Sequence, residues 1–154
     1  MNRILDLAAK GCGYVAGAFA LAMMALTVVD VVLRSVANAP LPGVYELVEL
    51  ALACTIFFAL PAVFLRNEHV VVEVVDHLVP RAVPALQRAA AVLTLVVLAV
   101  MGWQMIRPIE DVLAFGEVTF DLALPRILYW IPVLAGVALS ALAVLVTLFR
   151  RRRA

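Results

Sequence analysis

The chain has 154 residues, of which 66% are hydrophobic, and its formal net charge is only +1. Soluble domains use about 45–50% apolar residues, so the composition indicates a membrane protein rather than a water-soluble domain. The near-neutral charge gives no reason to expect a nucleic-acid partner. Cys12 and Cys54 lie in apolar runs without the spacing of a metal site or a disulfide framework, so we interpret both as packing residues.

Four apolar stretches approach or reach the length of about 20 residues that a helix needs to cross a bilayer core. They are residues 11–33, 45–65, 89–106 and 127–149. The first follows a basic N-terminal residue, as a signal peptide would, but its uncharged run of 19 residues is longer than the usual roughly 7–15. We therefore expect an uncleaved first helix and one all-α domain over residues 1–154 with four transmembrane helices.

Four charged residues are expected near one end of the first two helices. Asp30 and Arg34 are four residues apart, in the order that favours an ion pair on a helix, and Glu46 and Glu49 lie one turn apart at the start of the second helix. Two interpretations stay open for these charges. In the first, Glu46 and Glu49 complement the positive dipole at the N-terminus of the second helix, and Asp30 and Arg34 are interfacial residues. In the second, the excess negative charge of the group meets a cationic side chain of another subunit. No carboxylate falls in the middle of a span, which argues against a stand-alone proton-coupled carrier.

The segment 66–79 is rich in valine, which would suggest a strand, but a single strand leaves its backbone groups unpaired at a membrane. Its polar residues instead form one helical stripe: Arg66, His69, Glu73, Asp76 and His77. We predict an amphipathic helix in the cytoplasmic interface. The two histidines are the only ones in the chain, so we interpret them as interfacial residues and expect no metal, cofactor or catalytic group.

The basic residues predict the orientation, if the helices alternate in direction. Nine would lie on the side of the termini: Arg3, Lys10, Arg66, Arg81, Arg88 and Arg150 to Arg153. Three would lie on the other side: Arg34, Arg107 and Arg126. Because basic flanks resist translocation, we expect both termini in the cytoplasm and an acidic third loop in the periplasm. Aromatic residues expected near the outer interface agree: Tyr45, Trp103, Tyr129 and Trp130.

Several local patterns occur in a characteristic order. They are Asp30-Val-Val-Leu-Arg34, then Pro40-Leu-Pro-Gly-Val-Tyr-Glu46 with Glu49, then Glu68-His69-Val-Val-Val-Glu73, and finally Leu124-Pro125 leading through Tyr129 to Pro132. Over about residues 10–145 the chain resembles the small membrane subunit (DctQ type) of tripartite ATP-independent periplasmic (TRAP) transporters. It departs from the family pattern in two places. Family members often have a basic residue between the histidine and the following acid, and often a tryptophan where this chain has Phe57 and Phe58.

The resemblance implies a scaffold that pairs with a large multi-span subunit carrying the substrate and sodium sites. A periplasmic binding protein would deliver an organic acid, and the sodium gradient would drive an elevator-like movement of the large subunit. The small subunit would anchor the part of the transporter that does not move, and it would contact the lipid of the inner membrane. Small residues in the first and fourth helices, such as Gly17 and Gly136, would allow close helix packing, unless they face lipid. The expected contact with the binding protein is the acidic third loop: Glu110, Asp111, Glu117 and Asp121.

Two other classes of protein compete with this hypothesis. A membrane-anchor or redox subunit of a membrane enzyme would need haem histidines inside the helices or a polar catalytic cluster at one interface. A stand-alone homodimeric exporter would need an acid deep within a span, and Asp30 lies too near the end of the first helix. The sequence has neither pattern, so we expect a transporter subunit and not an enzyme.

Overall fold

The computed structural model describes residues 2–66 and 83–151, and within them the chain forms four α-helices. They are α1 (Asn2–Ala37), α2 (Val44–Arg66), α4 (Val83–Phe115) and α5 (Ile127–Arg151). Each contains a segment long and apolar enough to cross a membrane, which confirms the expected all-α fold with four spanning helices. The helix predicted over residues 66–79, with His69, Glu73, Asp76 and His77, lies outside the described residues except for its first position.

Two helices are longer than the apolar runs predict. Helix α1 extends beyond the expected 11–33 at both ends, and α4 continues past Ile106 to Phe115. Glu110 and Asp111 therefore lie on α4, and their predicted place in a loop is wrong. The reason is that hydropathy predicts which residues lie in the lipid, whereas a helix continues beyond them until its backbone is capped. Here the cap is Gly116, which has a φ of 61° and is followed by a hydrogen bond from the N–H of Glu117 to the carbonyl of Val112.

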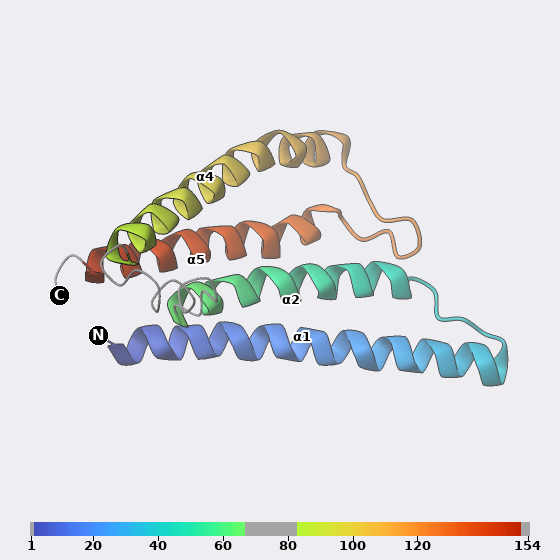
Figure 1. Ribbon diagram of the computed structural model, residues 1–154. Coiled ribbons are helices and arrows are strands. Elements are labelled where there is room, and N and C mark those ends of the chain that lie inside the picture. The colour runs from blue at the N-terminus through green and yellow to red at the C-terminus, as the bar shows by residue number, and fades with distance from the viewer. Residues whose placement is uncertain (1, 67–82, 152–154) are drawn as a thin grey trace.

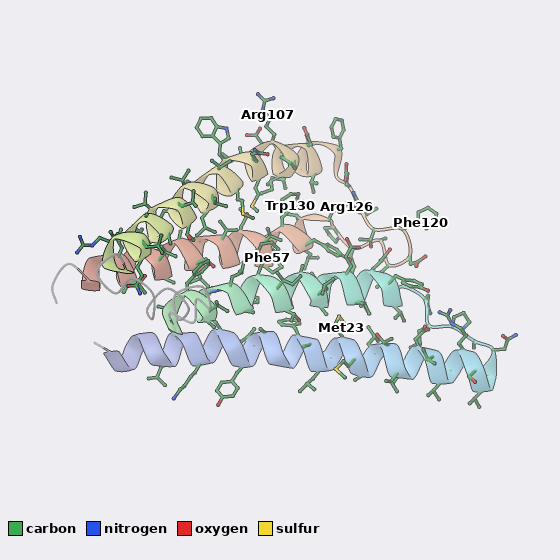
Figure 2. The ribbon with its side chains drawn as sticks, in the orientation of Figure 1. Met23, Phe57, Arg107, Phe120, Arg126 and Trp130 are labelled. Carbon is green, nitrogen blue, oxygen red and sulfur yellow. The ribbon has the colours of Figure 1, made fainter. Side chains whose placement is uncertain are left out.

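The helices lie side by side in one layer, in the order α1, α2, α5, α4 (Figure 1). Helix α1 packs on α2, α2 on α5, and α5 on α4, and no other pair of the described helices is in contact. The two outer helices therefore do not meet, and the layer is not closed into a bundle. Large apolar side chains project from it into open space, among them Leu21 at 69% exposure and Trp103 at 79% (Figure 2). Lipid or protein must cover these side chains.

The closest approach in the layer is between α2 and α5. Pro61 inside α2 has no N–H, so it cannot bond the carbonyl of Phe57 four residues earlier. Gly136 of α5 lies directly against this carbonyl, and a Cβ added at Gly136 would overlap with the Phe57 backbone. Ser140, one turn further along α5, is completely buried. Small residues thus bring the two central helices together, as expected for helix packing in lipid.

Apolar side chains complete the other two contacts of the layer. Between α4 and α5 the buried residues recur at helical spacing, which keeps one stripe of each helix at the contact. The cluster is formed by Leu98, Val137 and Val144, with Ala91, Leu95, Met105 and Ala141 of the same two helices packed against it. Phe57 and Phe64 of α2 also pack against it. Between α1 and α2 the rings of Phe19 and Phe58 stack with their centroids 6.5 Å apart. Helix α4 diverges from α5 toward its C-terminal end (Figure 1).

Candidate functional site

The candidate site lies at one end of the layer, which we call the loop end: α1 and α4 finish there, and α2 and α5 begin there (Figure 1). The charges singled out in the first two helices lie at this end: Asp30, Arg34, Glu46 and Glu49. The four acids of the predicted binding-protein contact are all exposed but fall into two pairs. Glu110 and Asp111 lie near the end of α4, and Glu117 and Asp121 lie on the segment that leads to α5.

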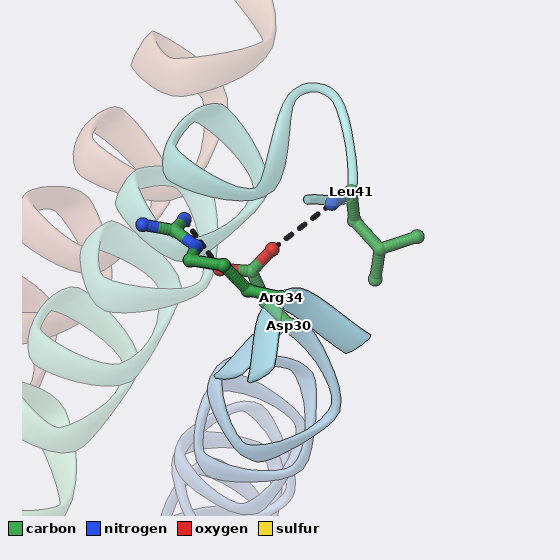
Figure 3. A network of polar contacts seen from close by, with 3 residues as sticks. All are labelled: Asp30, Arg34 and Leu41. Carbon is green, nitrogen blue, oxygen red and sulfur yellow. Dashed lines mark hydrogen bonds and ion pairs between the residues drawn. The ribbon is translucent and has the colours of Figure 1, made fainter. Parts of the chain in front are cut away.

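Asp30 ties the end of α1 to the segment that follows it. Its side chain is buried, and one carboxylate oxygen accepts a hydrogen bond and ion pair from Nη2 of Arg34 at 2.8 Å. The other oxygen accepts a hydrogen bond from the backbone N–H of Leu41 at 3.0 Å (Figure 3). The i,i+4 ion pair expected from the spacing is thus present. Both oxygens of Asp30 have partners within the chain, which stabilises the turn between α1 and α2.

Residues 117–126 form a short hairpin between α4 and α5. An isolated antiparallel bridge joins Val118 to Pro125, and the N–H of Thr119 donates to the carbonyl of Leu124 at 2.8 Å. At its base, the N–H of Arg126 donates to the carbonyl of Glu117 at 3.0 Å, and their side chains form an ion pair at 3.1 Å. These contacts fix the hairpin backbone from its base almost to its tip.

Glu46, in the first turn of α2, holds this hairpin. Its buried carboxylate accepts hydrogen bonds from the hydroxyl of Thr119 at 2.6 Å and from the backbone N–H groups of Asp121 at 2.6 Å and Leu122 at 3.0 Å. Its backbone carbonyl accepts a hydrogen bond from the hydroxyl of Tyr129 on α5 at 2.8 Å. A single residue therefore joins α2, the hairpin and α5.

Gly43, just before α2, makes room for the docked hairpin. Its φ of 73° is in the left-handed region, where glycine has no steric penalty. A Cβ at this position would overlap with the side chain of Leu122. Gly43 and the carboxylate of Glu46 thus together hold the hairpin against α2.

Glu49 differs from the other two acids of this group. It is exposed, and within residues 2–66 and 83–151 its carboxylate has neither a hydrogen bond nor an ion pair. Asp30 and Glu46 use their carboxylates inside the chain, whereas the carboxylate of Glu49 is available to another molecule. The described part of the chain contains no group of His, Cys, Asp and Glu that could hold a metal ion.

Sequence reasoning missed Thr119 and Tyr129 as partners of Glu46. These partners are 73 and 83 residues away in the chain, so no local spacing connects them. The only signal was a threonine between apolar residues in a segment otherwise rich in acids. Tyr129 was expected as an aromatic residue of the interface and as part of the family pattern, but not as a partner of Glu46.

The family model for tripartite ATP-independent periplasmic transporters, DctQ component, matches residues 23–154. The chain belongs to the DctQ family. No curated protein and no solved structure matches it. This DctQ protein is therefore a small membrane component of a TRAP transporter and a multi-pass inner-membrane protein, and its family is one of transporter components rather than enzymes.

Proposed function

We propose that this DctQ protein is the static scaffold of a sodium-gradient-driven transporter for organic acids. It anchors a large carrier subunit in the membrane, and a periplasmic binding protein supplies the substrate. The observation that carries the proposal is the open, single layer of helices. Because α1 and α4 do not meet, the four helices enclose no interior through which a substrate could pass. The path for the substrate is therefore assigned to the partner subunit.

The surface of the layer supports the scaffold role. Helices in lipid associate by close packing rather than by hydrophobic burial, so a broad face of side chains is a suitable contact for another membrane subunit. Exposed apolar residues are present on all four helices, for example Leu21, Leu52, Leu93 and Leu142. A carrier domain that moves through the bilayer needs a neighbour that does not move, and a wide layer resists tilting better than one helix.

The proposed orientation has the loop end in the periplasm and both termini in the cytoplasm. The nine basic residues against three support it, and α1 begins and α5 ends at the same end of the layer. The hairpin would then face the binding protein. The segment 66–79, with His69, Glu73, Asp76 and His77, would lie in the cytoplasmic interface and brace the scaffold there.

The test of the proposed function is reconstitution with and without each component. We expect this chain to co-purify with a large multi-span subunit, and we expect organic-acid uptake into proteoliposomes only when the large subunit, the binding protein and a sodium gradient are all present. An ATP-supplied control without the gradient should show no uptake. Transport by the isolated chain, or uptake by the large subunit at the full rate without it, would contradict the scaffold role.

Glu49 is the proposed contact with a cationic side chain of the large subunit. Reversing its charge with Glu49→Lys should lower the amount of co-purified large subunit at least about tenfold, because two like charges would meet at a desolvated contact. Glu49→Gln, which removes the charge without reversing it, should have a smaller effect. If the Glu49→Lys complex purifies intact, Glu49 does not lie at the contact.

The two pairs of exposed acids provide the proposed contact with the binding protein. Replacing Glu110, Asp111, Glu117 and Asp121 by their amides should lower uptake several-fold at limiting concentrations of binding protein. Saturating binding protein should restore most of the uptake, because charges at the edge of an interface mainly affect the association rate. The effect should shrink at high salt. Unchanged uptake of the fourfold variant at low salt would exclude this contact, and the two pairs tested separately would show which one matters.

A further inference from the structure

Apolar side chains are exposed on the 117–126 hairpin and at the end of α4 just before it. Phe120 is fully exposed, Val118 is 54% exposed, and Phe115 at the end of α4 is 78% exposed. Figure 2 shows the ring of Phe120 projecting from the hairpin, away from the helices. Exposed apolar side chains of this size, close together in the chain, indicate a surface that another phase or molecule covers.

The backbone that carries Phe120 is held in one conformation. Phe120 lies between Thr119, whose N–H bonds the opposite strand of the hairpin, and Asp121, whose N–H bonds the carboxylate of Glu46. The hydroxyl of Thr119 binds the same carboxylate. An aromatic side chain presented on a fixed backbone loses little conformational entropy when it inserts into a partner, so the tip is pre-organised for binding.

Glu46 also sets the depth of the hairpin. The apolar segment of α2 is Val44–Leu65, with 22 residues, and at 1.5 Å per residue it measures about 33 Å, close to a bilayer core of about 30 Å. The first turn of α2, where Glu46 lies, is therefore at the membrane boundary. Since the hairpin tip is bonded to the Glu46 carboxylate, Phe120 is held at this same boundary. The hairpin also connects two span ends, Phe115 and Ile127.

We propose that the 117–126 hairpin is a membrane-surface anchor that inserts Phe120 and Val118 into the headgroup region of the leaflet at the loop end. Glu46 fixes the insertion depth. Phenylalanine and other apolar side chains of interfacial segments bury at the boundary between headgroups and acyl chains, whereas the exposed charges of Glu117, Asp121 and Arg126 can stay in the aqueous layer above it. The proposal requires only that the chain crosses the membrane, so it is independent of the scaffold role and of the orientation. The competing occupant of the hairpin tip is the binding protein.

A tryptophan at position 120 measures the depth directly. Phe120→Trp is made in the full chain with Trp103→Phe and Trp130→Phe, and the protein is placed in lipid nanodiscs. We expect blue-shifted emission and several-fold stronger quenching by lipids labelled near the headgroup than by lipids labelled deep in the acyl chains or by aqueous iodide. Leu21→Trp in the same background is the matched control. Its site lies inside the α1 span and is 69% exposed, so deep labels should quench it best.

Two results would overturn the proposal. One is emission from position 120 that resembles tryptophan in water and is quenched mainly by iodide. The other is shielding that arises only when the binding protein is added, which would assign the hairpin tip to that partner. Adding Glu46→Gln should weaken the headgroup quenching, and an unchanged profile would refute depth control by Glu46.

A second measurement avoids the tryptophan replacements. Benzoylphenylalanine at position 120 of the otherwise unmodified complex should form lipid adducts on illumination. Adducts with protein alone would refute the anchor.

Discussion

Replacing Glu46 with glutamine should release the 117–126 hairpin from α2 while the four helices stay in place. The carboxylate accepts three hydrogen bonds, from the Thr119 hydroxyl and from the N–H groups of Asp121 and Leu122. An amide can accept with its oxygen only, and its NH₂ group would face donors. Hydrogen exchange read by mass spectrometry should show the amides of residues 117–124 exchanging at least about tenfold faster, because local opening no longer has to break charge-assisted bonds.

The matched control for this change is Glu49→Gln, one turn further along α2. Glu49 has no hydrogen bond or ion pair within the described ranges, so exchange in the hairpin of the isolated chain should not change. Thr119→Val removes one of the three donors and also the acceptor of the Leu124 N–H, and it should have an intermediate effect on the amides of Asp121 and Leu122. Equal protection in the Glu46→Gln variant and the unchanged chain would show that the carboxylate does not hold the hairpin.

Replacing Gly136 with alanine should force α2 and α5 apart. The added Cβ would overlap with the backbone of Phe57, and a helix backbone cannot move aside as a flexible side chain can. We expect the isolated chain to lose about 2 kcal/mol of stability, measured by thermal or denaturant unfolding in detergent, because overpacking a close contact costs about 1–3 kcal/mol. The gain in helix propensity on replacing glycine, up to about 1 kcal/mol, offsets only part of this loss.

The chain contains its own controls for the Gly136 prediction. Gly17 in α1 and Gly102 in α4 have no atom near the position of an added Cβ. Gly17→Ala and Gly102→Ala should therefore leave the stability of the isolated chain unchanged or raise it slightly. If all three variants unfold alike, the contact between Gly136 and Phe57 does not limit how closely α2 and α5 pack.

The sequence predicts best what depends on near neighbours in the chain. The apolar runs located all four spanning helices, and the i,i+4 spacing predicted the ion pair of Asp30 with Arg34. The apolar run predicted the wrong end for α4, since the helix continues through the charged residues after Ile106 until the cap at Gly116. Lipid solvation and backbone capping are different physical effects, and only the first is visible as hydropathy.

Long-range contacts could not be predicted because they depend on which helices become neighbours. The order α1, α2, α5, α4 differs from the order along the chain, and it alone brings Tyr129 and the hairpin to Glu46. Small residues illustrate the same limit. Gly17 and Gly136 have similar surroundings in the sequence, yet only Gly136 lies at a helix contact.

A layer one helix thick buries few side chains, so most substitutions in it test contacts with the surroundings rather than the packing of a core. Most large apolar side chains outside the three helix contacts are exposed on the surface of the layer, where lipid or another protein would cover them. Polar substitutions along α1 or α4 should therefore map, position by position, where lipid ends and the partner begins. They should do so with little loss of the fold itself, which the three contacts between neighbouring helices hold together.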